Sequence, residues 1–202
     1  MERILNTDVL FVTRTLEWLD LALSFDQQNR YVIQDKNGNR LGFVVEEGGI
    51  AKAITRQYLG RLRPFTAHVL GLDGRVLMSV SRGFTLINTS MKVSDSQGQD
   101  IGLVQQVFHP IRRKYELYDQ SRQFADIDEG FLSWSFNLMD ENGGLLALVS
   151  RNWSGIGTEV FTDAGLYALV FEGLANQKSM PMDQRIIALG CAITIDLDYF
   201  TR

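Results

Sequence analysis

The sequence predicts a mainly β fold with a central helix: a twelve-stranded closed antiparallel β-barrel around a buried C-terminal hydrophobic helix, plus an N-terminal amphipathic helix. The first observation is a repeated pattern, in which a turn rich in Asp, Asn and Gly separates two short runs of β-forming residues. The second is an apolar segment near the C-terminus. The third is the scarcity of proline, because Pro64, Pro110 and Pro181 all lie between proposed hairpins or before the final helix.

The repeated pattern predicts hairpins. Its four clearest copies are YVIQDKNGNRLGFVV, AHVLGLDGRVLMSV, MKVSDSQGQDIGLVQQ and FNLMDENGGLLALVS. Two weaker copies are KYELYDQSRQFADI and EVFTDAGLYALVF. Asp and Asn favour turns through local hydrogen bonds, and Gly supplies positive φ. Six hairpins predict about twelve strands over residues 29–172, and closing them into a barrel leaves no exposed sheet edge.

The C-terminal apolar segment predicts a core helix rather than a membrane span. Its uncharged run, Ile186 to Ile195, has ten residues. As a helix this run rises only ~15 Å, whereas a bilayer core is ~30 Å thick. Its apolar residues surround the helix instead of forming one stripe, and such a helix is buried. We therefore expect a central helix at 182–200, with Cys191 as a core residue rather than a nucleophile.

The N-terminal residues 1–28 are predicted to be a helical segment. Val12, Leu16, Leu19 and Leu23 follow helical spacing, with acidic residues between them. A helix packed outside or across one barrel end is favoured over a membrane-surface helix, because the polar face is acidic. No linker or low-complexity stretch divides the chain, so we expect a single domain over 1–202.

Composition excludes several functional classes. The chain has 202 residues, of which 45% are hydrophobic and 22% charged, and a formal net charge of −4. This charge argues against a nucleic-acid partner. One cysteine cannot form an internal disulfide, which predicts a reducing compartment. The two histidines, His68 and His109, have no acid at a diagnostic spacing, and no metal-binding or phosphate-loop motif occurs. We therefore expect no catalytic site, no metal site and no cofactor.

Charge patterning indicates a lipid-headgroup site. Two stretches, 48–72 and 102–115, contain no acid but several cations. The candidate headgroup-binding residues are Arg61, Arg63, Arg112, Arg113 and Lys114. Basic groups near anionic lipid contribute ~1 kcal/mol each. The alternative is a solvated face in which these cations pair with acids. Asp196 and Asp198 oppose the helix dipole, so we expect them to pair with arginines or backbone, with a site at the barrel mouth as the alternative.

Several stretches carry a family resemblance: NRYVIQDKNGNRLGF, RPFTAHVLGLDG, IRRKYELY, FLSWSF, RNWSGIGTEVFTDAGLYALVF and MDQRIIALGCAITIDLDYF. They resemble the phospholipid scramblase family, within the superfamily that contains the Tubby C-terminal domain, and are most similar to its branch named for altered inheritance of mitochondria. The resemblance implies a twelve-stranded barrel around a C-terminal helix. It also implies ATP-independent, bidirectional movement of phospholipids between leaflets of a mitochondrial membrane.

The resemblance leaves alternatives open. The chain could instead be a membrane-surface module of Tubby type that binds anionic lipid or a protein partner without translocation. Its location could be the cytosolic face of another membrane. The calcium loop of the family would begin at Asp163, but only this first ligand position offers a carboxylate, so we expect Asp163 to be a turn residue.

Overall fold

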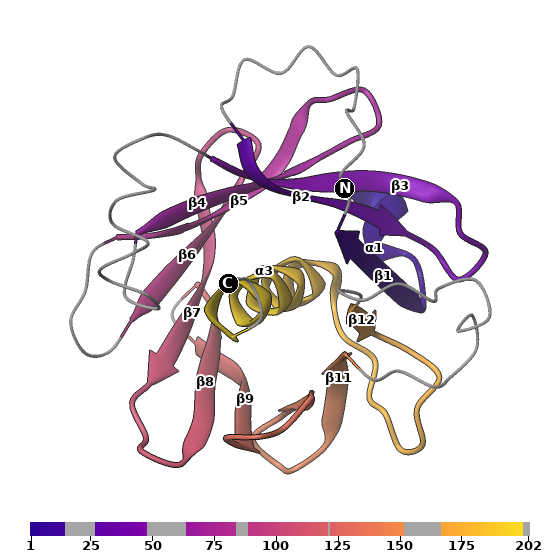
Figure 1. The fold of residues 1–202 in the computed structure, drawn as a ribbon. Coiled ribbons are helices and arrows are strands. Elements are labelled where there is room, and N and C mark those ends of the chain that lie inside the picture. The colour runs from indigo at the N-terminus through magenta and orange to yellow at the C-terminus, as the bar shows by residue number, and fades with distance from the viewer. Residues whose placement is uncertain (15–26, 48–63, 84–88, 121, 152–166, 200–202) are drawn as a thin grey trace.

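The computed structural model describes residues 1–14, 27–47, 64–83, 89–120, 122–151 and 167–199. Twelve strands in this described part form one closed antiparallel barrel, in which each strand pairs with two neighbours. A long helix runs through the ring of strands (Figure 1). The predicted fold class is confirmed.

The elements follow one another around the barrel. Their bounds are α1 (Glu2–Leu5), β1 (Val9–Arg14), β2 (Gln27–Gln34), β3 (Arg40–Glu47), β4 (Phe65–Leu70), β5 (Val76–Arg82), β6 (Ser90–Asp95), β7 (Asp100–Val107), β8 (Arg112–Asp119), β9 (Arg122–Gly130), β10 (Ser135–Met139), β11 (Leu145–Ser150), β12 (Tyr167–Val170) and α3 (Met182–Tyr199). Consecutive strands are neighbours, and β1 closes the barrel by pairing with both β12 and β2.

The prediction of an N-terminal helix is wrong for Val9–Arg14, which form a strand. A short helix does open the chain, but Val12 belongs to strand β1, where it pairs with Tyr167 of β12 and Ile33 of β2. The run Val9–Arg14 is rich in β-branched and aromatic residues, and its side chains alternate between two apolar clusters. Hydrogen bonding of β1 to β12 and to β2 favours the extended conformation more strongly than the helical spacing that begins at Val12 favours a helix. The rest of the predicted helix, residues 15–26, lies outside the described residues.

The four clearest predicted hairpins are confirmed as β2–β3, β4–β5, β6–β7 and β10–β11. In the first, the Asp35 carboxylate accepts hydrogen bonds from the backbone N–H groups of Asn37 and Asn39, at 2.8 and 2.9 Å. Gly38 has a φ of 79°, which a residue with a Cβ rarely adopts. Asp95 and Asp140 organise their turns in the same way. The local turn chemistry therefore fixes the register of these hairpins.

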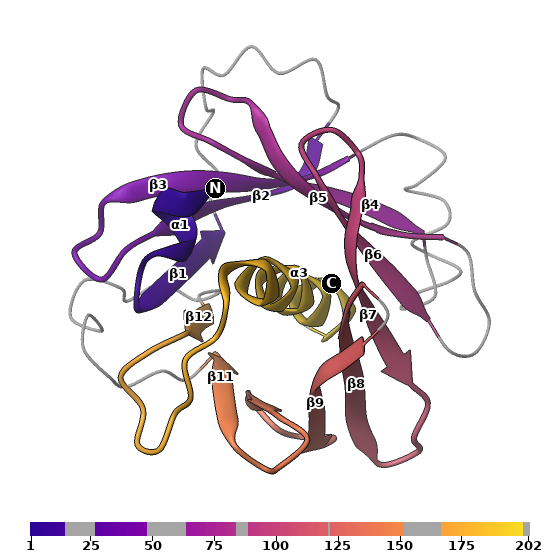
Figure 2. The same cartoon turned by 180° about the vertical axis from the view of Figure 1, so that it is seen from behind.

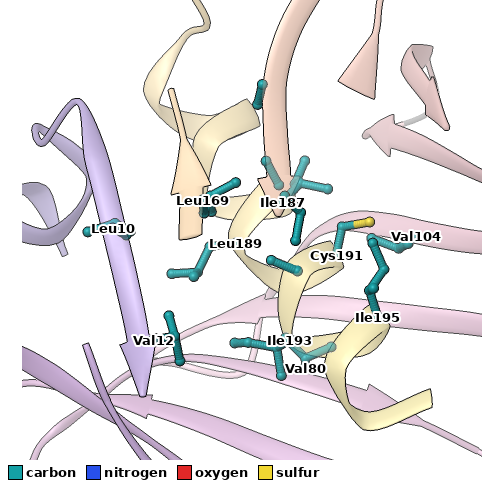
Figure 3. Packing of buried hydrophobic residues seen from close by; sticks show 14 of the residues in the cluster. Leu10, Val12, Val80, Val104, Leu169, Ile187, Leu189, Cys191, Ile193 and Ile195 are labelled. Atoms are coloured by element: carbon teal, nitrogen blue, oxygen red, sulfur yellow. The ribbon is translucent and has the colours of Figure 1, made fainter. Parts of the chain in front are cut away.

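Helix α3 lies at the centre of the hydrophobic core. It spans Met182–Tyr199, in agreement with the predicted 182–200, of which residue 200 lies outside the described residues. Residues on all of its sides are buried, and Figure 3 shows Ile187, Leu189, Cys191 and Ile193 among strand residues such as Val80 and Leu169. The prediction that Cys191 is a core residue is confirmed. In the described part of the chain, no helix combines the length and the apolar content that crossing a bilayer requires.

The barrel has two distinct ends. The turn end carries the four hairpin turns and the start of α3, where Arg185 Nη1 donates a hydrogen bond to the carbonyl of Leu5 at 2.9 Å. The rim end is the opposite one, where β4, β8 and β10 begin and α3 finishes. There, Gln106 Nε2 donates to Tyr199 Oη at 2.9 Å. The view from behind in Figure 2 shows the same path of α3 through the ring.

Candidate functional site

Strand β8 begins at the rim end with the predicted basic triplet, and its alternation separates the three cations. Arg112 is exposed and Lys114 is half-buried on the outer surface. Arg113 and Tyr115 are buried and face the barrel interior. Since successive side chains of a strand point to opposite faces, three adjacent cations do not form one surface cluster. Only Arg112 and Lys114 of this triplet lie on the outer surface.

Arg112 and Lys114 share one acidic partner, Asp128 of strand β9. Arg112 Nε donates to Asp128 Oδ1, and Lys114 Nζ lies 2.9 Å from Asp128 Oδ2. The side chains of Arg112 and Lys114 keep 44% and 33% of their surface exposed. Hydrogen bonds from Arg112 and then Lys114 hold the pKa of Asp128 below its ordinary value. Two cations against one carboxylate leave this cluster with a net positive charge at neutral pH.

Arg113 links the rim to the end of α3. Its guanidinium lies 4.0 Å from the ring centre of Tyr199 and 5.4 Å from that of Phe131. Its Nη1 also donates a hydrogen bond to the carbonyl of Ser133 at 3.1 Å. Cation–π contacts with these two rings and with Phe136, whose ring centre lies 5.5 Å away, hold the side chain in the barrel mouth. In this conformation the outward cations of the triplet are therefore Arg112 and Lys114.

The second predicted basic cluster, with Arg61 and Arg63, lies outside the described residues, as does Asp163. Strand β4, which follows that cluster in the chain, runs in the same direction as β8 and begins at the same rim end. His68 lies on β4, where its ring nitrogens contact Ser79 Oγ and Glu47 Oε1, both at 2.8 Å. The headgroup role of both basic clusters stays a prediction.

Two rim loops expose apolar side chains that the sequence analysis missed. Phe108 and Ile111, in the β7–β8 loop, are 72% and 71% exposed. Leu132 and Trp134, in the β9–β10 loop, are 82% and 53% exposed, and Phe131 beside them is 45% exposed. The register pairs Arg112 with Gly130, which places the two loops side by side. We call residues 108–111 and 131–134 the apolar tips. FHPI and FLSW contain neither the Asp nor the Gly of the confirmed hairpin turns, but this difference does not determine whether their apolar side chains are exposed.

Behind the rim, Asp198 of α3 forms a buried network. Arg82 Nη1 lies 2.6 Å from Asp198 Oδ1, and Tyr115 Oη donates to Asp198 Oδ2 at 3.2 Å. The Arg82 guanidinium also stacks on Phe65, 4.7 Å from its ring centre. Burial and the Asp198 carboxylate raise the pKa of Tyr115 well above its ordinary value. The expectation that Asp198 pairs with an arginine is confirmed.

A hollow at the turn end measures about 280 Å³. Its polar walls pair with one another: Lys178 bonds to Asp140, and Gln184 donates to Asp119 at 2.7 Å. Within the described ranges, His, Cys, Asp and Glu side chains do not gather in the groups of three or more that could hold a metal ion.

Comparison with known proteins connects this geometry to a family. The family model named Scramblase matches residues 1–202. The chain belongs to the scramblase family. A phospholipid scramblase family protein of Schizosaccharomyces pombe is 36% identical over 98% of the chain. Altered inheritance rate of mitochondria protein 25 of Saccharomyces cerevisiae is 35% identical, also over 98% of the chain.

More distant relatives include phospholipid scramblase 1 of Mus musculus, which is 26% identical over the whole chain. The chain covers 61% of the S. pombe relative, 72% of the S. cerevisiae relative and 64% of the mouse relative. It therefore spans less than two thirds of two of these proteins. No solved structure matches it. The resemblance recognised from the sequence is confirmed at the level of the family.

Proposed function

We propose that this scramblase-family chain binds phospholipid membranes with its rim end and moves phospholipids between the two leaflets. The movement is bidirectional, needs no ATP and involves no covalent chemistry on the lipid, so the chain is not an enzyme in the usual sense. The observation that carries the proposal is the rim itself, where Arg112 and Lys114 lie beside exposed Phe108 and Ile111. The names of the relatives support phospholipid as the substrate.

The rim cations supply the attraction to anionic lipid. Each cation near an anionic surface contributes ~1 kcal/mol. Asp128 offsets part of this contribution, because it pairs with both Arg112 and Lys114. A phosphate group has oxygens that can take the place of the Asp128 carboxylate. We therefore expect binding to require anionic lipid and to weaken with salt, since screening acts within ~8–10 Å at ordinary ionic strength.

The second candidate function is a membrane-surface or protein-interaction module of Tubby type that binds anionic lipid without moving it. One observation favours it: α3 fills the described interior of the barrel, and residues such as Leu189 and Ile193 are buried there against the strands. Passage of lipid through this interior would require α3 to leave. Translocation along the outside of the barrel does not meet this obstacle.

Partners and location follow from the same proposal. The expected partner is an anionic phospholipid membrane, with no nucleic acid and no cofactor. The printed name of the S. cerevisiae relative supports a mitochondrial membrane, with the cytosolic face of another membrane as the alternative. Calcium stays an alternative from the family resemblance, and millimolar Ca²⁺ is expected to raise the melting temperature little.

A vesicle experiment tests the proposal. The chain is reconstituted with vesicles that carry fluorescent phospholipid, and translocation is measured as the fraction of dye that an external reductant quenches. Quenching beyond the outer leaflet at low protein-to-lipid ratio supports translocation. Binding to vesicles that contain phosphatidylserine, without such quenching, supports the second candidate. Failure to bind any vesicle contradicts translocation and the lipid-binding form of the second candidate.

Matched variants locate the contact. Arg112→Gln with Lys114→Gln should weaken binding to phosphatidylserine vesicles and reduce its salt dependence. The control is Arg75→Gln with Arg122→Gln, which removes two exposed cations that pair with acids at the turn end. Equal losses from both pairs would show that net charge alone, rather than the rim, governs binding.

A further inference from the structure

Exposed apolar side chains are concentrated at one place on the molecule. In the described part of the chain, the large exposed apolar residues are Leu72, Phe108, Ile111, Phe131, Leu132 and Trp134. All except Leu72 belong to the apolar tips. Exposed apolar patches mark interaction surfaces, whereas single exposed residues need no explanation. Leu72 is such a single residue, in the β4–β5 turn at the opposite end of the barrel.

The apolar tips are held in place by hydrogen bonds. In the β9–β10 loop, Ser133 N donates to the carbonyl of Gly130 at 2.9 Å, and Arg151 N donates to that of Trp134 at 3.0 Å. In the β7–β8 loop, the backbone N–H of Ile111 donates to His109 Nδ1 at 3.3 Å. Each loop also has only four residues between its strands. The tips therefore present their apolar side chains without first having to order a long loop.

Charge changes in a definite order with distance from the tips. The first outward residues of β8 are Arg112 and Lys114, which are cations. Farther along the same face come Glu116 on β8 and Asp126 on β9, which the register pairs with each other. The turn end carries the exposed Asp-containing turns. On the outer face of β8 and β9 the order is thus apolar, then cationic with Asp128 as the shared partner, then acidic. At the turn end, acids occur together with cations such as Arg75 and Arg122.

This order matches the layers of an anionic bilayer. The acyl boundary accepts apolar side chains, the phosphate layer attracts cations, and acids are favoured in the water beyond. Tryptophan also prefers the interface between headgroups and hydrocarbon, which is where Trp134 would lie. A protein partner would not require cations to follow the apolar residues in this sequence.

We propose that the two apolar tips insert side by side into the headgroup–acyl boundary of a phospholipid bilayer. Insertion orients the barrel with the end of α3 toward the membrane and the turn end away from it. This inference rests on the proposed function and deepens it, because it names the inserting element and its orientation. Arg112 and Lys114 then meet the phosphate layer, and Phe108 and Leu132 pass below it.

Co-sedimentation with vesicles tests the insertion. The parent chain is compared with Phe108→Ser plus Leu132→Ser, using vesicles of phosphatidylcholine with and without phosphatidylserine. Loss of each apolar contact should lower the partition coefficient about tenfold, so the double variant should bind about a hundredfold more weakly. Leu72→Ser is the matched control and should bind like the parent. Thermal unfolding of each variant verifies that the barrel is intact.

Depth-dependent quenching provides the second measurement. Vesicles with brominated acyl chains should quench the fluorescence of the parent, and Trp134→Phe should remove this quenching while it keeps an aromatic ring at the tip. Persistence of the full quenching in Trp134→Phe would overturn the inserted position of this tip.

The outcomes separate this inference from the proposed function. If the tip variant binds as tightly as the parent while Arg112→Gln with Lys114→Gln binds weakly, the insertion is overturned and surface binding stands. If the parent binds no vesicle, both fail. Sedimentation of the parent as a dimer that the tip substitutions dissociate, with vesicle binding unchanged, would assign the tips to a contact between two copies and overturn the inference.

Discussion

Arg82 and Asp198 form an ion pair that is closed off from solvent. The distance from Arg82 Nη1 to Asp198 Oδ1 is 2.6 Å, and their side chains are 1% and 0% exposed. Arg82 ends strand β5, and Asp198 lies in the last turn of α3. An acid in that turn opposes the helix dipole, so the guanidinium offsets an unfavourable position. The pair therefore fixes the end of α3 to the barrel wall.

Breaking this pair should be costly. Asp198→Ala leaves the buried Arg82 without its carboxylate, and removing one partner of a buried pair costs about 3–5 kcal/mol. Replacing both residues, as Arg82→Met with Asp198→Leu, should recover much of that loss, because the orphaned charge is removed. Urea unfolding of Arg82→Met, Asp198→Leu and the double variant measures the coupling. Additive losses, with the double variant the least stable, would contradict it.

Gly190 should tolerate no larger residue. In an open helix, Gly→Ala would stabilise by about 1 kcal/mol, so the sign of the effect distinguishes a packed site from an open one. A Cβ at Gly190 would lie 2.9 Å from Val93 Cγ2 and 3.3 Å from Val80 Cγ2. We expect Gly190→Ala to destabilise by about 1–3 kcal/mol, and Gly190→Leu by more. Thermal unfolding measures both.

Gly130 provides the matched control for this prediction. A Cβ there would meet no atom within 4 Å, and its φ lies outside the left-handed region. Gly130→Ala should therefore leave the melting temperature nearly unchanged. A gain of stability in Gly190→Ala would show that α3 has room on this side and would contradict the close packing around it.

The features predicted from the sequence are those that local chemistry determines. Asp35 and Gly38 fix a turn through bonds and dihedral angles within five residues, so DKNGN is informative by itself. The helix α3 was predictable because an uncharged run without an apolar stripe suits only a fully apolar environment. Val12 was misassigned because its strand is stabilised by β12, which lies near the other end of the chain.

The site was predicted less well than the fold. The sequence predicts one cluster from the three cations beginning at Arg112, whereas strand alternation turns Arg113 inward. The neighbouring pattern contained the signal, since Tyr115 and Leu117 are the apolar, inward positions of the same strand. The exposure of Phe108 and Leu132 had no such signal, because apolar residues between strands are as compatible with a packed barrel end as with solvent.

Cys191 should be unreactive in the native protein. Burial raises the pKa of its thiol, and the Asp198 carboxylate raises it further. The thiolate is the nucleophile, so a raised pKa and a closed environment both suppress alkylation. We expect a thiol reagent to label Cys191 only after unfolding, at a rate that follows the urea transition. Rapid labelling without denaturant would contradict the sealed position of α3.

Asp126 should make stability depend on pH in a direction opposite to that of most acids. Burial raises its pKa, Asp128 and Glu116 raise it further, and Lys114 partly offsets the rise. In the unfolded chain the pKa is about 3.9. The folded state therefore holds the proton more tightly, and the stability that protonation provides is complete below the unfolded pKa and lost as the pH rises through the folded pKa.

Asp126→Asn removes this penalty. The variant should be more stable than the parent at neutral pH, by a few tenths of a kcal/mol because solvent screens a partly exposed group, and equally stable at about pH 3. Asp100→Asn is the contrasting control, because hydrogen bonds from Lys92 and Ser94 lower the pKa of Asp100. That substitution should reduce stability at neutral pH. Urea midpoints at the two pH values measure both variants, and a loss of stability in Asp126→Asn at neutral pH would reverse the sign argued here.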